Sequence, residues 1–400
     1  MRIPEPTPVC AGDIDGNGIP EIITLEKWAP SYLPGGATTT VIALLRYELA
    51  GDQLAQVQRF EVTVPIAEPF VRFIALGDVD DDGFADVGIL RRLARGFSSI
   101  YPGVQVETGV AIDVIRGGPL GFTQVSTIQF PVPDADRPSA GGTPLVRGIG
   151  DFDGDGFSDL ALGQELEQTD TCAQRPRGYV DILRGSPTAD FAERIARIDG
   201  YTGAEPLGDI DGDGLADIGM TRDPADHIGP IAPSTNCAGA YMLIGLDPGD
   251  ANIVFGGASA SPRSVVWTMP EETETGCTNG WHYTDRFPVH GTLAAGGDLD
   301  GDGYDDFVLV SPETYPGGGI ACVPGGARIR VLNGSAAPTG FAVSQILAGP
   351  GDALVNFASI VRIGGPDGPG GDHLLVASQG RADASKYTMI PRSVSVYTGA

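Results

Sequence analysis

The amino-acid sequence predicts an all-β protein built from repeated, four-stranded antiparallel units. Three observations lead to this fold class. A nine-residue acidic motif recurs along the 400 residues, short apolar stretches flank each copy, and no segment keeps a helical periodicity of apolar residues. Glycine and proline, with 59 and 32 residues, also favour turns over long helices.

The recurring motif reads D-x-D-x-(D/N)-G-x-x-(D/E) and occurs five times. We number its copies loops 1 to 5 and the residues of each copy positions 1 to 9; the loops span 13–21, 78–86, 151–159, 209–217 and 298–306. A sixth segment, 365–373, keeps the register but lacks most of the carboxylates. Five copies of so specific a pattern indicate a structural repeat.

Apolar stretches predict four strands around each loop, as the third unit illustrates. One stretch, 145–150, ends at the loop, and a second, 159–163, follows it directly. A third stretch, 179–185, ends in a glycine turn, and a fourth, 193–198, comes next. Each unit is therefore expected to be an antiparallel meander whose first two strands are joined by the acidic loop.

The repeat predicts a β-propeller, because one four-stranded unit cannot bury both of its faces whereas units packed around an axis can. We expect a single domain over 1–400 with six visible blades, starting near residues 9, 71, 144, 204, 291 and 358. The chain ends after the third predicted strand of the sixth blade, and residues 1–8 carry three prolines, which makes them poor candidates for the missing fourth strand of that blade. The propeller is thus expected to have six blades with an incomplete last one, or seven with the chain truncated.

The acidic loops are expected to bind cations, because several carboxylates in one short loop repel one another unless a cation lies between them. Oxygens at positions 1, 3 and 5, the carbonyl of position 7 and the carboxylate of position 9 would surround the ion, and glycine at position 6 would permit the bend. Such hard, charged ligands favour Ca²⁺, and about five ions are expected. The predicted ligands are, in loop order, Asp13, Asp15, Asn17, Ile19, Glu21; Asp78, Asp80, Asp82, Phe84, Asp86; Asp151, Asp153, Asp155, Phe157, Asp159; Asp209, Asp211, Asp213, Leu215, Asp217; and Asp298, Asp300, Asp302, Tyr304, Asp306.

The motif has two other interpretations, and the first of them, an EF-hand, is rejected. An EF-hand needs flanking helices and an acidic residue at position 12, where this chain has Thr24, Ile89, Leu162, Met220 or Leu309. The motifs could also be solvated acidic turns without metal, an alternative that weighs more for loop 1, with Asn17 and Glu21. The sixth segment is expected to hold no ion.

The repeated G-D-x-D-G-D-G-x-x-D pattern, followed by an apolar strand, resembles the FG-GAP (VCBS-like) repeats of the integrin α-subunit propeller and its bacterial relatives. The resemblance covers nearly all of the chain, although the Phe-Gly and Gly-Ala-Pro signatures are largely missing. It implies that the loop between the first two strands of each blade binds Ca²⁺. Integrin propellers have seven blades, against the six counted here.

The composition excludes some classes of partner. Lys and Arg total 25 against 52 Asp and Glu, a net charge of −27, which argues against binding to nucleic acid or to anionic membranes. No apolar run reaches the roughly 18 residues of a membrane span. The first residues lack the apolar core of a secretory signal, yet Ca²⁺ sites of the extracellular type fill outside cells, so a secreted or cell-surface location is expected.

Aromatic and basic side chains gather in the connections expected on the face opposite the calcium loops. They are Trp28, Tyr32, Trp281, His282, Tyr283, Arg286 and Tyr315. Because such residues are favoured at interfaces, a protein or carbohydrate ligand is expected there. The same rings could instead cap the propeller core.

The five cysteines lack the spacing of a zinc site. In the expected topology four of them lie on the face opposite the loops, where Cys172–Cys237 and Cys277–Cys322 are candidate disulfides, and Cys10 is a buried free thiol.

No G-x-S-x-G, H-E-x-x-H or phosphate-binding glycine loop occurs, so an enzyme is not expected. We expect a monomeric, calcium-binding module for ligand binding or cell adhesion. A calcium-dependent glycan lyase or hydrolase and a structural segment of a larger surface protein are the alternatives.

Overall fold

The computed structural model of the chain is all-β, as predicted from the sequence. It describes residues 2–18, 21–28, 39–50, 53–65, 70–93, 95–97, 105–107, 109–131, 145–166, 177–201, 203–221, 250–268, 271–278, 281–288, 292–311, 328–336, 338–348, 356–363, 373–379, 382–383, 388–389 and 393–398. Every regular element within these residues is a β-strand. A search of the same residues finds no helix with the length and apolar character needed to cross a membrane.

The chain divides into two compact units, which are described separately. Unit 1 comprises Met1–Thr169, Pro176–Ala204 and Gly256–Pro262, and unit 2 comprises Asp170–Arg175, Glu205–Phe255 and Arg263–Ala400. Loops 1 to 3 therefore belong to unit 1, and loops 4 and 5 to unit 2. The single domain and the closed ring remain predictions.

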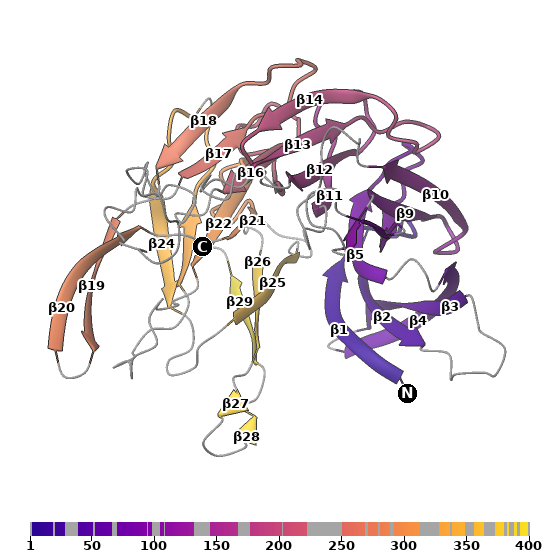
Figure 1. The fold of residues 1–400 in the computed structure, drawn as a ribbon, viewed down its shortest axis with the longest axis horizontal. Coiled ribbons are helices and arrows are strands. Elements are labelled where there is room, and N and C mark those ends of the chain that lie inside the picture. Colours follow the sequence, from indigo (N-terminus) through magenta and orange to yellow (C-terminus); the bar gives the residue numbers. More distant parts are fainter. Residues whose placement is uncertain are drawn as a thin grey trace. The chain divides into compact units, whose positions relative to one another are not determined.

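Unit 1 contains three four-stranded antiparallel sheets, which we call blades 1 to 3 (Figure 1). In each blade, neighbouring strands of the sheet follow one another in the sequence. A small hairpin of β7 (Arg95–Phe97) and β8 (Gln105–Glu107) lies in the connection between the second and third strands of blade 2. The strands of the blades are β1 (Arg2–Cys10), β2 (Ile22–Trp28), β3 (Thr39–Ala50) and β4 (Gln53–Pro65); β5 (Phe70–Gly77), β6 (Asp86–Arg92), β9 (Gly109–Arg116) and β10 (Gln124–Pro131); and β11 (Leu145–Gly150), β12 (Asp159–Leu166), β13 (Arg177–Leu183) and β14 (Arg194–Asp199).

Unit 2 contains blades 4 to 6, of which blade 6 has three described strands. The strands are β15 (Glu205–Gly208), β16 (Asp217–Thr221), β17 (Asp250–Val254) and β18 (Ser264–Thr268); β21 (Thr292–Gly297), β22 (Asp306–Ser311), β23 (Arg328–Leu332) and β24 (Val343–Ala348); and β25 (Asn356–Ile363), β26 (His373–Gln379) and β29 (Ser393–Thr398). One hairpin, β19 (Glu271–Thr278) with β20 (Trp281–Pro288), separates blades 4 and 5 in sequence, and another, β27 (Ala382–Asp383) with β28 (Thr388–Met389), lies within blade 6.

The predicted meanders are confirmed, with one difference at the start of the chain. Each of the five acidic loops joins the first and second strands of a blade, and these flanking strands exclude the EF-hand interpretation. The first strand was expected to start near residue 9, but β1 begins at Arg2 and pairs with β2 of its own blade. This strand lies at the edge of its sheet, where proline is tolerated, and its register shifts between Glu5 and Val9.

The hydrophobic core lies between neighbouring blades. Strands β6 and β9 are buried along nearly their whole length, because their alternate side chains enter two different clusters. Ile89 belongs to a cluster with blade 1 residues such as Leu44, and Leu90 belongs to one with blade 3 residues such as Leu160. A third cluster joins blades 4 and 5 in the same way. The near-continuous apolar runs of the inner strands therefore reflect burial on both faces.

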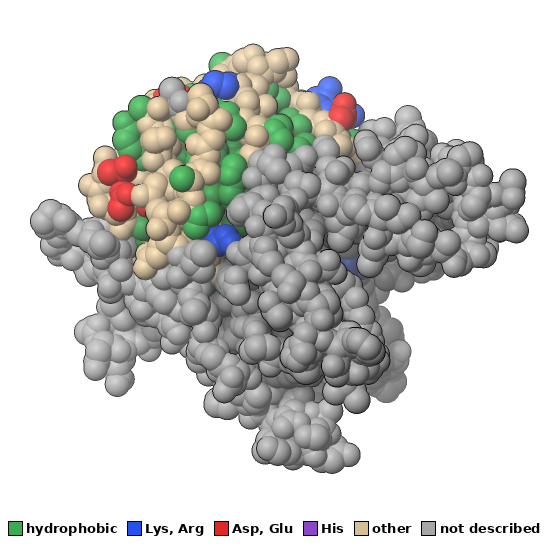
Figure 2. All heavy atoms as spheres, turned by 90° about the vertical axis from the view of Figure 1, so that its left-hand side faces the viewer, with side chains coloured by type: hydrophobic (Ala, Val, Ile, Leu, Met, Phe, Trp, Pro, Cys, Tyr) green, Lys and Arg blue, Asp and Glu red, His purple; other side chains and the backbone are tan. Residues whose placement is uncertain are grey.

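The outer strands are partly solvated. Exposed and half-buried side chains alternate along β10, as expected of a strand with one face towards water. Exposed large hydrophobic side chains occur singly on outer strands, at Val57, Val125 and Val266. On the face drawn in Figure 2, the described hydrophobic side chains are interspersed with other residues, and acidic and basic side chains lie near the margin. Single exposed apolar residues of this kind are ordinary on a protein surface.

Candidate metal centres

Each acidic loop folds around the carboxylate at position 1. In loop 3, Asp151 Oδ1 accepts hydrogen bonds from the backbone N–H groups of Gly154 (2.7 Å) and Asp155 (3.2 Å), and Oδ2 accepts one from Gly156 (3.0 Å). Equivalent bonds form in the other loops, through Asp13, Asp78, Asp209 and Asp298. Aspartate recurs at position 1 because its short side chain reaches the backbone a few residues on, which holds the loop closed.

The glycine at position 6 makes the predicted bend. Its φ lies in the left-handed region in all five loops, with values of 83°, 87°, 93°, 88° and 93° at Gly18, Gly83, Gly156, Gly214 and Gly303. Nothing lies within 4 Å of the place that a Cβ would take on Gly83. Backbone conformation, and not lack of space, therefore selects glycine at this position.

The glycines just before loops 1, 2 and 4 lie against the neighbouring blade. Gly12 and Gly77 have φ of +87° and +77°, and a Cβ on them would lie 2.7 Å from Ala85 Cβ and 2.5 Å from Ser158 Oγ, respectively. Both contacts come from position 8 of the next loop. The N–H of that position donates to the position 1 carbonyl of the preceding loop, from Ala85 to Asp13 (2.8 Å), Ser158 to Asp78 (2.8 Å) and Asp305 to Asp209 (2.9 Å). Within a unit, neighbouring loops are thus directly linked.

The carboxylate at position 9 is fully buried in every loop. The five residues, each 0% exposed, are Glu21, Asp86, Asp159, Asp217 and Asp306. One oxygen of each accepts the backbone N–H of position 2 at 2.6–3.2 Å. In loops 2, 3 and 5 the other oxygen accepts the N–H of a glycine just after the third strand, from Gly117, Gly185 or Gly334 at 2.7–3.0 Å. Position 9 therefore fixes the loop to the third strand of its own blade.

Burial changes the acidity of these carboxyl groups. Removal from water raises the pKa of Glu21, Asp86 and Asp159 to about 7 and that of Asp306 to about 6, while backbone N–H groups oppose the change. Burial also raises the pKa of the position 3 carboxyls of Asp153, Asp211 and Asp300, and the neighbouring position 5 carboxylate adds to this. A nearby cation would favour the charged form of all these groups.

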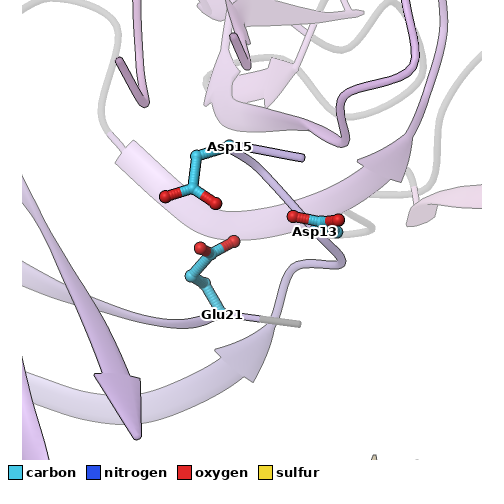
Figure 3. A group of neighbouring side chains, drawn as sticks. All are labelled: Asp13, Asp15 and Glu21. Atoms are coloured by element: carbon cyan, nitrogen blue, oxygen red, sulfur yellow. The ribbon is translucent and has the colours of Figure 1, made fainter. Parts of the chain in front are cut away.

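Carboxylate oxygens converge in each loop. In loops 1 to 4, one oxygen from each of positions 1, 3 and 9 lies within 4.8 Å of the others, and in loop 5 the group consists of positions 1, 3 and 5. Figure 3 shows loop 1, where the Asp15 and Glu21 carboxylates face each other and the Asp13 carboxylate lies beside them.

The other predicted ligands are placed differently. The position 5 residues of loops 2 to 4 are exposed, and the carboxylate of each accepts the backbone N–H of position 7 of its own loop at 3.0 Å. The acceptors are Asp82, Asp155 and Asp213. Phe84, Phe157, Leu215 and Tyr304, at position 7, are half-buried, and Ile19 lies outside the described residues. The structure thus gathers positions 1, 3 and 9 most consistently.

The groups present fit a hard cation. Asp80 Oδ1 and Asp211 Oδ1 are buried, and neither has a hydrogen-bond partner within the part of the chain that the structure describes; both side chains are 6% exposed. An unpaired carboxylate oxygen in the interior is unfavourable, and a cation in the loop would compensate it. All the converging groups are carboxylates, which are the ligands that Ca²⁺ prefers.

The sequence analysis missed the partner of position 3 in each loop. Position 3 contacts an arginine or asparagine, in the pairs Asp15–Arg46, Asp80–Arg116, Asp153–Arg184, Asp211–Arg263 and Asp300–Asn333. In blades 2, 3 and 5 this partner directly precedes the glycine after the third strand, so an R-G or N-G pair there is the available signal. In blade 4 Phe255 takes that place, and the Arg263 guanidinium lies 3.7 Å from the centre of its ring.

Most of the predicted ligand face involves side chains that the structure does not describe. Trp28 ends β2, and Trp281, His282, Tyr283 and Arg286 lie on β20, with His282 opposite Cys277 of β19. Residues outside the described part are Tyr32, Tyr315, Cys172, Cys237 and Cys322. The ligand surface and the two disulfides therefore stay predictions.

Comparison with known proteins leaves the family open. No protein-family model matches the chain, and no curated protein does. Among solved structures, it is similar to BBS1N in a crystal structure of its complex with ARL6DN soaked with lead, with 11% identity and a TM-score of 0.37 over 94% of this chain and 90% of that one.

Two further solved structures show a likeness of the same degree. One is an ACO/RPE65 chimera, with 12% identity and a TM-score of 0.39 over 86% of this chain and 65% of that one. The other is a subtype N11 neuraminidase-like protein of A/flat-faced bat/Peru/033/2010 (H18N11), with 8% identity and a TM-score of 0.38 over 100% of this chain and 93% of that one. Because these scores are low, the propeller-like repeat architecture rests on the sheets described above.

Proposed function

We propose that the chain is a calcium-binding propeller module in which loops 2 to 5 each hold one Ca²⁺ ion. The observation that carries the proposal is the unpaired buried oxygen of Asp80 and of Asp211, each beside a buried position 9 carboxylate. Loop 1 differs in its charged groups and is treated in the next subsection.

Calcium suits these loops better than other common cations. The converging ligands are carboxylates, without the thiolate or imidazole groups that select zinc or copper. Each of loops 2 to 5 carries at least four aspartates, and among the residues that the structure describes one positive side chain at most contacts position 3. A bound Ca²⁺ would supply two positive charges at the place where these carboxylates converge.

The role of the ions is structural stabilisation of the blades. Position 1 is oriented by backbone N–H groups and position 9 by backbone bonds to its own blade, so the ligands are already in place before an ion arrives. An ion present at 100 times its Kd stabilises the folded state by about 2.7 kcal/mol per site. Two or three such sites match the net stability of an ordinary domain, which is about 5–15 kcal/mol.

The module serves as a secreted or cell-surface domain that binds a protein or carbohydrate ligand. Support for the location comes from the calcium requirement, since sites of the extracellular type bind in the range of about 10⁻⁴ to 10⁻³ M. Support for the ligand surface comes from the aromatic and basic residues of β20.

Thermal unfolding in Ca²⁺, Mg²⁺ and EDTA tests the calcium part of the proposal. We expect a higher Tm in millimolar Ca²⁺ than in EDTA, with a smaller rise in Mg²⁺. Asp80→Asn and Asp211→Asn should each reduce the Ca²⁺-dependent rise, whereas the control Glu61→Gln, an exposed acid of β4 outside the loops, should not. Equal melting curves in Ca²⁺ and EDTA would refute the proposal.

Binding to glycan and protein arrays, with and without Ca²⁺, tests the ligand part. A ligand that is bound and released unchanged supports a binding module. Cleavage of arrayed glycans would instead favour the calcium-dependent enzyme, and no binding to any array would favour a structural segment of a larger surface protein.

A further inference from the structure

Loop 1 already contains a positive charge among its predicted ligands. Arg46 of β3 reaches into the loop, where its Nη1 lies 2.7 Å from Asp15 Oδ2 and 3.2 Å from Glu21 Oε1. Its Nη2 lies 3.0 Å from Glu48 Oε1. The Arg46 side chain is 8% exposed and the Glu21 side chain 0%, so the bond between them is a buried, charge-assisted hydrogen bond, and the bond to Asp15 is partly buried.

Arg46 contacts one oxygen of each of the two carboxylates that face each other in Figure 3, those of Asp15 at position 3 and Glu21 at position 9. Ca²⁺ lies about 2.3–2.6 Å from its ligand oxygens. An ion bound to the same two oxygens would therefore come close to Nη1, and two cations would repel each other in a buried site. The guanidinium and an ion exclude each other at this place.

Loops 2 and 3 are arranged differently at position 9. The Asp86 carboxylate accepts hydrogen bonds from the backbone N–H groups of Val79 (3.2 Å) and Gly117 (2.8 Å). The Asp159 carboxylate likewise accepts the backbone N–H groups of Phe152 and Gly185. The glutamate of loop 1 is longer by one methylene group, and its Oε1 binds the guanidinium in place of a backbone N–H.

Position 5 also separates loop 1 from the others. It is Asn17, so the loop lacks one of the carboxylates that loops 2 to 5 carry there. Because loop 1 has fewer negative charges and already contains a buried guanidinium, it attracts a further cation less strongly than the other loops do.

We propose that loop 1 binds no metal ion and is held instead by the Arg46 guanidinium, which occupies the place that Ca²⁺ takes in loops 2 to 5. The proposal rests on the proposed function for the other loops. It makes blade 1 the part of the repeat whose acidic loop is closed without calcium.

Counting bound Ca²⁺ in single-loop variants tests the proposal on the full chain. Equilibrium dialysis against radioactive Ca²⁺ would compare the wild type with Asp15→Asn in loop 1 and with the matched variant Asp80→Asn in loop 2. We expect Asp80→Asn to lose one ion per chain and Asp15→Asn to lose none. Loss of one ion in Asp15→Asn overturns the inference while leaving calcium binding by the other loops intact.

A wild type that binds no Ca²⁺ would refute the proposed function, and a second measurement then judges the inference by itself. Arg46→Met, Asp15→Asn and the double variant would be melted in EDTA. If Arg46 holds loop 1, the double variant should lose clearly less Tm than the sum of the two single losses, because both remove the same interaction. Additive losses would overturn the proposal. The control pair Arg46→Met and Asp80→Asn, whose residues belong to different blades, should be additive.

Discussion

Acidifying the metal-free chain from about pH 8 to about pH 6 is expected to stabilise it, which is the reverse of the usual response of paired carboxylates. The cause is the burial of position 9, which raises the pKa of Asp86 and Asp159 to about 7 in the folded chain. Their ordinary value is 3.8, so the unfolded chain carries them ionised over this whole range. The folded chain therefore takes up protons that the unfolded chain does not.

The size of the effect follows from the number of protons bound in each state. At about pH 6, a group with a pKa of about 7 is roughly nine-tenths protonated when folded and almost fully ionised when unfolded. Each such group then contributes a slope of about −1.2 kcal/mol of unfolding free energy per pH unit. Asp306, with a pKa of about 6, contributes about half as much at that pH. Because the folded-state pKa is the raised one, the contribution is lost as the pH rises through about 7.

Urea unfolding in EDTA, followed by circular dichroism between about pH 5.5 and pH 8.5, measures this slope. Asp159→Asn removes one of the titrating groups and should flatten the curve, whereas Asp190→Asn, an exposed aspartate outside the acidic loops, should leave the slope in this range unchanged. A free energy of unfolding that stays constant or rises from about pH 6 to about pH 8 would contradict the reasoning. An unaltered slope in Asp159→Asn would contradict it too.

Two further predictions concern the packing of the blades. Gly12→Ala and Gly83→Ala replace glycines with the same φ of +87°, so each should lower the free energy of unfolding by about 1–2 kcal/mol for the left-handed conformation. Gly12→Ala should lower it further, because its Cβ would lie 2.7 Å from Ala85 Cβ. Equal losses of the two variants in urea unfolding would show that the neighbouring blade exerts no constraint. Arg91→Met breaks a buried bidentate pair with Asp113, at 2.7 Å for both bonds, and should cost about 3–5 kcal/mol in the same assay. A loss below about 1 kcal/mol would mean that the pair behaves like an exposed one.

The repeat and its strands could be predicted from the sequence because they depend on local patterns. The acidic motif marks each turn, and the apolar stretch that follows it marks a strand that is buried on both faces, as β6 shows. Glycine at position 6 was predictable because only a left-handed conformation closes so short a loop. The first strand was expected to start near residue 9, and its earlier start at Arg2 was not predicted, because the three prolines before residue 9 hide the pairing with β2 from a local pattern.

The partners of the loops could not be predicted, because they lie far away in sequence. Arg46 is 31 residues from Asp15 and 25 from Glu21, and only the fold of β3 brings its guanidinium into loop 1. In blade 4, Phe255 takes the place that an arginine or asparagine has after the third strand in blades 2, 3 and 5. The contact to Asp211 comes instead from Arg263, just before β18. The link from Ala85 to Asp13 is likewise a property of two blades packed together.

A crystal structure grown in millimolar Ca²⁺ tests the central claim most directly. The account predicts an ion in each of loops 2 to 5, at about 2.3–2.6 Å from oxygens of positions 1, 3 and 9 in loops 2 to 4 and of positions 1, 3 and 5 in loop 5, with the Arg46 guanidinium in loop 1. Loops 2 to 5 filled only by water at that concentration would contradict it.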